Sequence, residues 1–291
     1  MKIADNTLQA VTTYFKQQLE TVLDANELKM TYRIMMAHYF EFSATDLVIK
    51  RDYRFTESEL VKVIHCVKRL QKKEPLAQII GETEFFGLRF LVNQHTLIPR
   101  PETEELVDWV ITDNANSHSS ILEIGTGSGC IPISLKKQLP NTKITAIDIS
   151  AEALVIANKN AVLNNVDVDF QLTNVLTAQF DKTQQWDIIV SNPPYIAQKE
   201  FDSMDKNVTD YEPHLALFVS DNDPLIFYRK IAELGLQHLS ARGKIYVEIN
   251  QYLGKETIAL FESFGYLNVE LRQDINGNDR MIRASKPLTV S

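Results

Sequence analysis

From Ser119 onwards, short apolar runs alternate regularly with longer stretches of helical period, and this alternation limits most strongly what the chain can fold into. Five runs are short enough to be buried strands, at residues 121–124, 143–147, 168–172, 187–190 and 244–249. Stretches of helical length lie between them, at residues 130–139, 151–164 and 224–239. Strand and helix in alternation predict a doubly wound α/β sheet of mostly parallel strands.

The end of the chain predicts a different kind of strand pairing. A helix is expected at residues 252–264 with Gly265 as its stop, followed by strands at residues 268–273 and 280–284. Asn276-Gly277 between these two strands is typical of a tight hairpin turn. We therefore expect a seven-stranded sheet that ends in an antiparallel pair.

The first part of the chain differs, because apolar residues recur at helical spacing through residues 6–73. Thr56 followed by Glu59 predicts a capping box at the start of the last of these helices. Residues 78–92 are rich in β-branched and aromatic types, which favours a short hairpin. We expect a helical-bundle domain over residues 1–75, a β-hairpin linker over 76–98 and an α/β domain over 99–291.

Length and composition are those of a globular protein. With 291 residues, of which 44% are hydrophobic, the chain can fill a sizeable core. No apolar run approaches the roughly 18 residues of a membrane span, and the start lacks a signal-peptide pattern, so we expect a cytoplasmic protein without membrane contact. Cys66 and Cys130 lack metal-ligand spacing, so we expect neither a disulfide framework nor a metal site.

The formal net charge of −8 is divided unevenly along the chain. Residues 1–75 carry 12 basic and 10 acidic side chains, net +2, and the other 18 and 28 give residues 76–291 a net charge of −10. An acidic α/β part disfavours stable nucleic-acid binding, which relies on clustered Lys and Arg. This difference in charge favours two domains with different partners. The alternative, that the basic residues near the end of the first part are only the solvated face of one helix, is about as well supported.

A glycine-rich loop follows the first expected strand and opens a helix. Glycines let the main chain turn sharply and let a ligand approach it closely. The spacing is GxGxG with an acidic residue before it, whereas a dinucleotide site needs GxGxxG. We predict that this loop binds a cofactor through Glu123, Gly125, Thr126, Gly127, Ser128 and Gly129.

Asp148 ends the second expected strand, where a carboxylate can accept hydrogen bonds from both hydroxyls of a ribose. The alternative is a cap for the following helix, but Ser150 could serve there, so ribose binding is favoured. Adenosine is therefore the expected part of the cofactor. We add to the predicted site Ile149 after Asp148, and Asn174 and Val175 after the third strand, where Asn174 can both donate and accept hydrogen bonds.

Asn192-Pro193-Pro194-Tyr195 follows the fourth strand, at the carboxyl end where open α/β sheets bind ligands. The two prolines favour a rigid, extended loop. A planar nitrogen is a poor nucleophile because its lone pair is delocalised. The Asn192 side-chain oxygen and the Pro193 carbonyl could each accept one N–H of such a nitrogen and orient it for attack. The Tyr195 ring could stack on the planar group. The tetrapeptide thus predicts the catalytic residues of an S-adenosylmethionine-dependent methyltransferase, with Asn192 also at the cofactor.

Two kinds of planar nitrogen stay open, a side-chain amide and the exocyclic amine of adenine. The adenine reaction would require the base to be extruded and a basic channel for the nucleic-acid backbone, and the acidic α/β part disfavours that. The six histidines are scattered without metal spacing, and no GxSxG or P-loop sequence occurs, so no other catalytic device is indicated. A cofactor-binding scaffold without catalysis is disfavoured by the intact tetrapeptide.

In its motifs the chain resembles the peptide-chain release factor glutamine methyltransferases, the PrmC/HemK family. The resemblance covers most of the chain, and the matching stretches are residues 75–81, 85–90, 97–104, 125–129, 148–150, 191–196 and 211–213. Asn174 departs from it, where an acidic residue is common, and so does Asn250, where glycine is more usual. The resemblance implies a small helical domain followed by a Rossmann-like class I methyltransferase domain.

By the same resemblance, the substrate is the glutamine of the Gly-Gly-Gln motif in class 1 release factors, methylated on its amide nitrogen with S-adenosylmethionine in support of translation termination. The resemblance implies that residues 125–129 and Asp148 bind the cofactor, that residues 192–195 hold the glutamine, and that residues 98–104 lie near the active site. A glutamine methyltransferase of a ribosomal protein is the alternative within this chemistry. An enzyme of this kind can work as a monomer.

Overall fold

The computed structural model describes Ile3 and residues 5–115 and 118–287. The chain forms two compact units. One comprises Met1–Gly81 with Asp205–Tyr211, and the other Glu82–Met204 with Glu212–Ser291. Every helix of the described residues is too short or too polar to cross a membrane.

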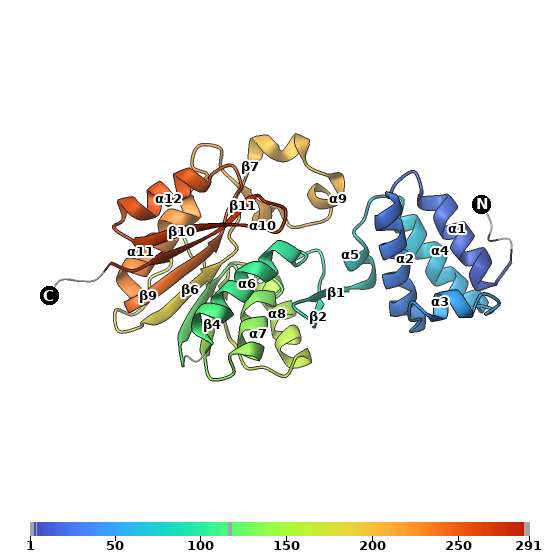
Figure 1. Ribbon diagram of the computed structural model, residues 1–291, viewed down its shortest axis with the longest axis horizontal. Coiled ribbons are helices and arrows are strands. Elements are labelled where there is room, and N and C mark those ends of the chain that lie inside the picture. Colours follow the sequence, from blue (N-terminus) through green and yellow to red (C-terminus); the bar gives the residue numbers. More distant parts are fainter. Residues whose placement is uncertain (1–2, 4, 116–117, 288–291) are drawn as a thin grey trace. The chain divides into compact units, whose positions relative to one another are not determined.

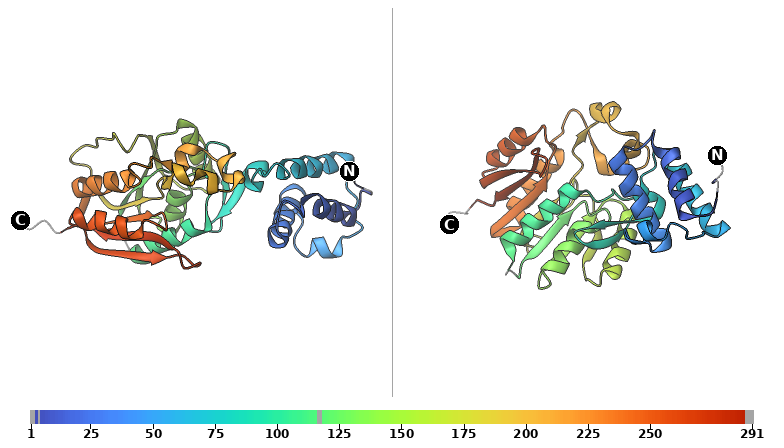
Figure 2. Two further views of the ribbon diagram at one scale, coloured as in Figure 1. Left: turned by 90° about the horizontal axis from the view of Figure 1, so that it is seen from above. Right: turned by 45° about the vertical axis from the view of Figure 1, so that its right-hand side comes forward.

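The first unit is a bundle of helices (Figures 1 and 2), which are α1 (Leu8–Leu19), α2 (Ala25–Phe40), α3 (Asp46–Ile49), α4 (Glu57–Leu70) and α5 (Leu76–Ile80). Their apolar faces form one buried cluster that includes Leu8, Phe15, Met35, Val63 and Val67. The predicted capping box is confirmed, since the Thr56 hydroxyl accepts from the Glu59 N–H while the Glu59 carboxylate accepts from the Thr56 N–H.

A short segment from much later in the chain belongs to this unit. It contains α9 (Lys206–Thr209) and ends at Tyr211. The Tyr211 carbonyl accepts from Gln78 Nε2 at 2.7 Å, and its hydroxyl donates to the Lys72 carbonyl at 3.0 Å. These two hydrogen bonds hold the segment against the end of the bundle.

The second unit is built on a seven-stranded sheet of β3 (Ser120–Ile124), β4 (Lys143–Asp148), β5 (Asp169–Leu172), β6 (Trp186–Ser191), β9 (Leu239–Glu248), β10 (Leu267–Gln273) and β11 (Asp279–Ser285). The strand order is β10-β11-β9-β6-β3-β4-β5. Five neighbouring strands run parallel, and β11 pairs antiparallel with both β9 and β10. The predicted mostly parallel sheet with its antiparallel C-terminal hairpin is confirmed.

Helices cover both faces of this sheet, as Figure 1 shows. One face packs against α6 (Pro101–Asn114), α7 (Cys130–Gln138) and α8 (Ala151–Leu163), and the other against α11 (Ile226–His238) and α12 (Gly254–Ser263). Strand β9 divides its side chains accordingly, because successive residues of a strand point to opposite faces. Tyr246 packs in the cluster with α6, and Ile245 and Val247 pack in the cluster with α11.

Two expectations about element limits are wrong. Residues 78–80 lie in helix α5 instead of the hairpin, because Gly81 with φ +81° ends a helical turn first; the hairpin itself is β1 (Glu82–Phe85) and β2 (Leu88–Leu91). Strand β9 begins five residues before residue 244, because Leu239 pairs with Trp186 ahead of an irregularity in the ladder.

Between β6 and α11 lie further short elements, which are β7 (Ile196–Ala197), η1 (Gln198–Ser203), α10 (His214–Leu217) and β8 (Phe218–Val219).

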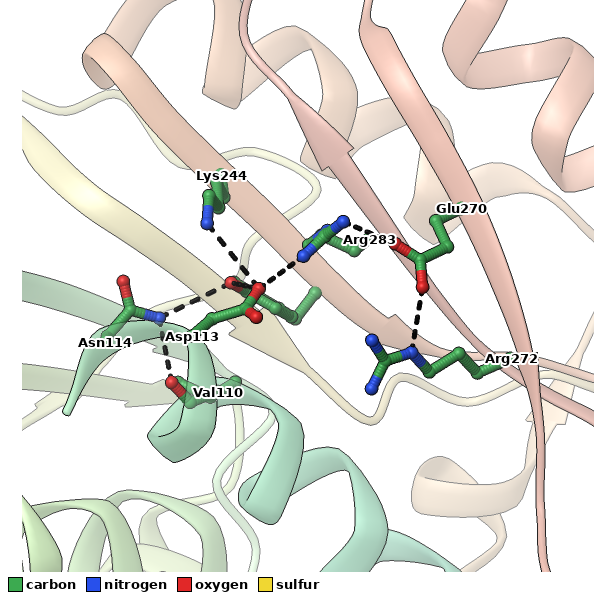
Figure 3. Close-up of polar contacts among 8 residues, drawn as sticks. Val110, Asp113, Asn114, Lys244, Glu270, Arg272 and Arg283 are labelled. Carbon is green, nitrogen blue, oxygen red and sulfur yellow. Dashed lines mark hydrogen bonds and ion pairs between the residues drawn. The ribbon is translucent and has the colours of Figure 1, made fainter.

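The C-terminal end of α6 is fixed to the sheet by a cluster of charged side chains (Figure 3). The Asp113 carboxylate accepts from the Tyr246 hydroxyl at 2.7 Å and from an Arg283 N–H at 2.6 Å. Arg283 also pairs with Glu270, which accepts from Arg272 Nε at 2.9 Å. Burial raises the pKa of Asp113, but the hydrogen bonds from Tyr246 and Arg283 lower it by more, so the net shift is downward.

We predict that Asp113→Asn lowers the free energy of unfolding by about 1–3 kcal/mol, because a charge-assisted acceptor is lost while its buried donors stay. Urea denaturation at neutral pH measures this, and Asp108→Asn, at an exposed carboxylate of the same helix, is the control. Because the pKa of Asp113 is lower in the folded than in the unfolded state, the stabilisation is complete above the ordinary aspartate pKa and disappears in stronger acid. A difference between wild type and variant that does not shrink in acid would contradict this account.

Candidate active site

The candidate site lies at the carboxyl ends of the parallel strands, where the chain leaves β3, β4, β5 and β6 in four neighbouring loops. The glycine loop follows β3, Asp148 ends β4, Asn174 follows β5 and Asn192 follows β6. A Cβ built on Gly125 would lie 3.8 Å from the Asn192 carbonyl oxygen, so the first and last of these loops are in contact. The parallel sheet therefore brings together residues that are far apart in sequence.

Glycines are required in the loop after β3 for two different reasons. Gly125, Gly127 and Gly129 have φ of +78°, +52° and +81°, a region that side chains disfavour. A Cβ on Gly129 would also come within 2.9 Å of Ile133 and 3.2 Å of Ala157, where α7 packs on α8. A Cβ on Gly127 would meet nothing within 4 Å. The loop therefore leaves open space above Gly127, as a ligand cradle needs.

Asp148 fastens this loop to the second strand. One carboxylate oxygen accepts from the Gly127 N–H and the other from the Ser150 N–H, both at 2.8 Å. The helix that follows is capped by the Ser150 hydroxyl, which accepts from the Ala153 N–H at 3.1 Å. Asp148 is thus not the cap, and its carboxylate stays beside the glycine loop. Burial raises its pKa.

Asn160 on α8 supports the loop from below and is fully buried. Its side-chain oxygen accepts from the Leu91 N–H at 2.7 Å, and its amide group donates to the carbonyls of Leu91 and Ser128 at 2.9 and 2.8 Å. One amide thereby joins strand β2, helix α8 and the glycine loop. No sequence pattern indicates this role, because asparagine is more often exposed than buried.

Four buried oxygen atoms beneath the loop have no hydrogen-bond partner among the described residues. They are both carboxylate oxygens of Glu123 and the hydroxyls of Thr126 and Ser128. Burial raises the pKa of Glu123 well above its ordinary value. Buried polar atoms without a partner are rare in folded proteins, and these four are concentrated in the strand end and loop at residues 123–128.

The loops enclose a cavity of about 340 Å³, which is within the usual range for small-molecule sites. The predicted residues on its wall are Gly125, Gly127, Asp148, Ile149, Asn174, Val175, Asn192, Pro193 and Pro194. The predicted residues that do not line it are Glu123, Thr126, Ser128, Gly129 and Tyr195. Wall residues that the sequence prediction missed are His95, Leu97, Ile124, Ile147, Ser150, Ala153, Thr173, Leu176, Pro213, Leu215, Ala216 and Phe227.

Glu212 connects two segments that carry residues of the missed wall. Its buried carboxylate accepts from the Ile98 N–H at 3.1 Å and pairs with Arg100. This joins the segment that carries Leu97 to the segment that carries Pro213, although they are more than 100 residues apart in sequence. Both segments were noted in the family resemblance, which was the available signal for this wall.

The tetrapeptide after β6 is held from several sides. The Ser191 hydroxyl before it donates to the Ile124 carbonyl at 2.8 Å, which ties the loop to β3. Asn192 Nδ2 donates to Thr103 Oγ1 at 3.1 Å, and the Tyr195 hydroxyl donates to Glu248 Oε1 at 3.0 Å. Figure 1 shows that α6, which carries Thr103, lies next to the sheet on which this loop is built.

Tyr195 is partly buried at the end of the tetrapeptide. Its ring packs against the core cluster shared with α11, and burial raises the pKa of its hydroxyl. Asn250 Nδ2 donates to the Tyr195 carbonyl at 3.1 Å and to Glu200 Oε1 at 3.3 Å, so this departure from the family pattern contributes to holding the loop. These contacts hold Tyr195 and its loop in place, and stacking of the ring on a substrate stays a prediction.

Family models match both parts of the chain. Residues 10–81 match the PrmC N-terminal domain, and residues 104–210 match the Methyltransferase small domain. The fold is also that of a solved methyltransferase from Pyrococcus furiosus, with a TM-score of 0.52 and 17% identity over 80% of this chain and 100% of that one. This likeness bears on the fold alone.

Similarity to curated proteins is much higher. The chain is 50% identical over 277 residues to a release factor glutamine methyltransferase of Flavobacterium psychrophilum, covering 94% of this chain and 97% of that protein. It is 42% identical over 279 residues to a protein of the same name from Bacteroides thetaiotaomicron, covering 96% and 100%. Identity at this level over nearly the whole length of both proteins establishes that the chain belongs to the release factor glutamine methyltransferase family.

Proposed function

We propose that this protein transfers a methyl group from S-adenosylmethionine to the side-chain amide nitrogen of the glutamine in the Gly-Gly-Gln motif of class 1 peptide-chain release factors, in support of translation termination. The observation that carries this proposal is the Asn192 tetrapeptide on the wall of the cavity formed by the glycine loop, in a chain 50% identical to a protein named for this activity. The family uses S-adenosylmethionine, and the Asp148 carboxylate on the cavity wall fits the ribose hydroxyls of that cofactor.

The cofactor would be held by three loops. Gly125 and Gly127 offer main chain without side chains, the Asp148 carboxylate is placed for ribose hydroxyls, and Asn174 lines the part of the cavity after β5. Asn174 Oδ1 accepts from the Leu176 N–H at 3.0 Å, which leaves its amide N–H groups for adenine. The bound cofactor supplies a methyl group on a sulfonium, which is a good leaving group.

An amide nitrogen is a weak nucleophile, and the tetrapeptide would orient it for attack on the methyl group. The Asn192 side-chain oxygen and the Pro193 carbonyl can accept the two N–H groups of the glutamine amide and fix the direction of its lone pair. Both oxygens also stabilise the positive charge that develops on the nitrogen during transfer. A strong general base is not needed, because the nitrogen loses its proton after the methyl has arrived.

We also propose that the enzyme acts as a monomer in the cytoplasm, where release factors are used, without stable nucleic-acid binding. The net charge of −10 over residues 76–291 supports the last point, since phosphate neutralisation needs the opposite sign. Light scattering that gave a dimer mass would contradict the monomer.

The substrate assignment predicts that label from S-adenosylmethionine appears on the Gly-Gly-Gln glutamine of a release factor that was produced without this modification. Peptide mass spectrometry after incubation locates the methyl group. Parallel incubations with ribosomal proteins and with nucleic acid serve as controls. Label on either of them, with none on the release factor, would overturn the assignment.

We predict that Asn192→Ala slows methyl transfer by roughly a hundredfold or more, because one of two groups that orient and stabilise the nitrogen is lost. Cofactor binding should change much less, since the glycine loop and Asp148 remain. Single-turnover kinetics and calorimetric titration with S-adenosylmethionine measure the two effects separately. Turnover close to that of the wild type would refute the role of Asn192.

We further propose that residues 1–75 recognise the release factor while residues 100–291 transfer the methyl group, on the basis of the charge split. Lys62 and Lys68 are exposed on α4. Reversing both charges should lower kcat/KM for a whole release factor roughly tenfold, and leave a short Gly-Gly-Gln peptide unaffected. Equal effects on both substrates, or none, would contradict the recognition role.

A further inference from the structure

A chain of three hydrogen bonds runs behind the tetrapeptide. Asn192 Nδ2 lies 3.1 Å from Thr103 Oγ1, Thr103 Oγ1 lies 2.6 Å from Glu248 Oε2, and Glu248 Oε1 lies 3.0 Å from the Tyr195 hydroxyl. Thr103 comes from α6, Glu248 from the end of β9, and the other two from the loop after β6. Thr103 and Glu248 are 2% and 1% exposed, so water does not compete for these contacts.

The direction of the protons in this chain is fixed from one end. The Thr103 and Tyr195 hydroxyls both donate to the Glu248 carboxylate, which can only accept when it is ionised. A threonine hydroxyl has one proton, so Thr103 Oγ1 can meet Asn192 only as an acceptor. The Asn192 group next to Thr103 must then be the NH2 group and not the oxygen.

We infer that Thr103 and Glu248 are positioning residues that set the orientation of the Asn192 amide, so that its oxygen is left to accept an N–H of the target nitrogen. The inference rests on the proposed function of the tetrapeptide. The two ends of an asparagine amide have nearly the same shape, so packing alone does not choose between them. With the amide turned over, Asn192 would present a donor to the N–H of the target, and the acceptor would be lost.

Threonine hydroxyls within helices commonly donate to the carbonyl four residues earlier, as Thr12 does to Leu8 and Thr257 does to Leu253. For Thr103, in the first turn of α6, that carbonyl belongs to Pro99, which precedes the helix. Thr103 donates instead to Glu248, which is 145 residues away in sequence. It also does not cap its own helix, since α6 has no side-chain cap hydrogen bond at Arg100. Among the contacts described for it, the hydroxyl serves Asn192 and Glu248.

The first test compares Thr103→Val with Thr103→Ser. Valine keeps the shape but has no hydroxyl, so the Asn192 amide loses its orientation and kcat for glutamine methylation should fall about tenfold. Serine keeps the hydroxyl and should restore most of the turnover. The KM and the dissociation constant for S-adenosylmethionine should stay close to the wild-type values in both variants. Thr257→Val, which removes another fully buried helical hydroxyl, is the matched control and should keep its turnover.

A double-mutant cycle distinguishes positioning from a general structural effect. If Thr103 acts through Asn192, Thr103→Val should cause no further loss in the Asn192→Ala background. The same fold-loss in both backgrounds would overturn the inference. So would wild-type turnover of Thr103→Val, or an equal loss of turnover in Thr257→Val.

Glu248→Gln provides a second, independent variant. A glutamine amide must donate with one end, so it cannot accept from both Thr103 and Tyr195, and kcat should fall without a matching change in cofactor affinity. Wild-type turnover of Glu248→Gln would overturn the inference while leaving the proposed function intact. A wild-type protein that methylates no glutamine would overturn the proposed function and the inference with it, so the two failures are distinguishable.

Discussion

Burying a carboxylate costs free energy that hydrogen-bond donors offset, and Glu248 at the end of β9 is buried with two such donors beside it. Thr103 on α6 and Tyr195 in the loop after β6 supply the donors. Burial raises the pKa of Glu248, which the two hydrogen bonds and the charge of Arg280 oppose. Helix α6, strand β9 and the loop after β6 therefore meet at one buried polar point.

Helix α6 has a fixed position beside Glu248 because both of its ends are hydrogen-bonded to strand β9. Thr103 contacts Glu248 near the start of the helix, and Asp113 contacts Tyr246 near its end. Between them Trp109 packs edge-on against the Tyr246 ring, with centroids 5.7 Å apart. A helix fixed in this way can place a single hydroxyl beside Asn192 with little freedom, as a preorganised site requires.

The sequence allowed much of this protein to be predicted, and the errors have physical causes. The seven strands, their antiparallel end and the Thr56 capping box follow from local periodicity and turn chemistry. The cavity wall around Leu97 and Pro213 could not be predicted in this way, because Glu212 joins two segments that are distant in sequence. The hydrogen bond from the Tyr195 hydroxyl to Glu248 could not be predicted either, because the two residues are 53 positions apart in sequence.

By itself, the sequence determined which loops form the candidate site, since the glycine loop, Asp148 and the tetrapeptide all follow parallel strands, whose carboxyl ends lie at one edge of the sheet. It also determined the family, through motifs that need no coordinates to be recognised. Only the tertiary structure decided how Asn192 is oriented. That orientation depends on the contact of Asn192 with Thr103, 89 positions away in sequence, and on the contact of Thr103 with Glu248, 145 positions away. No local pattern of residues encodes such contacts.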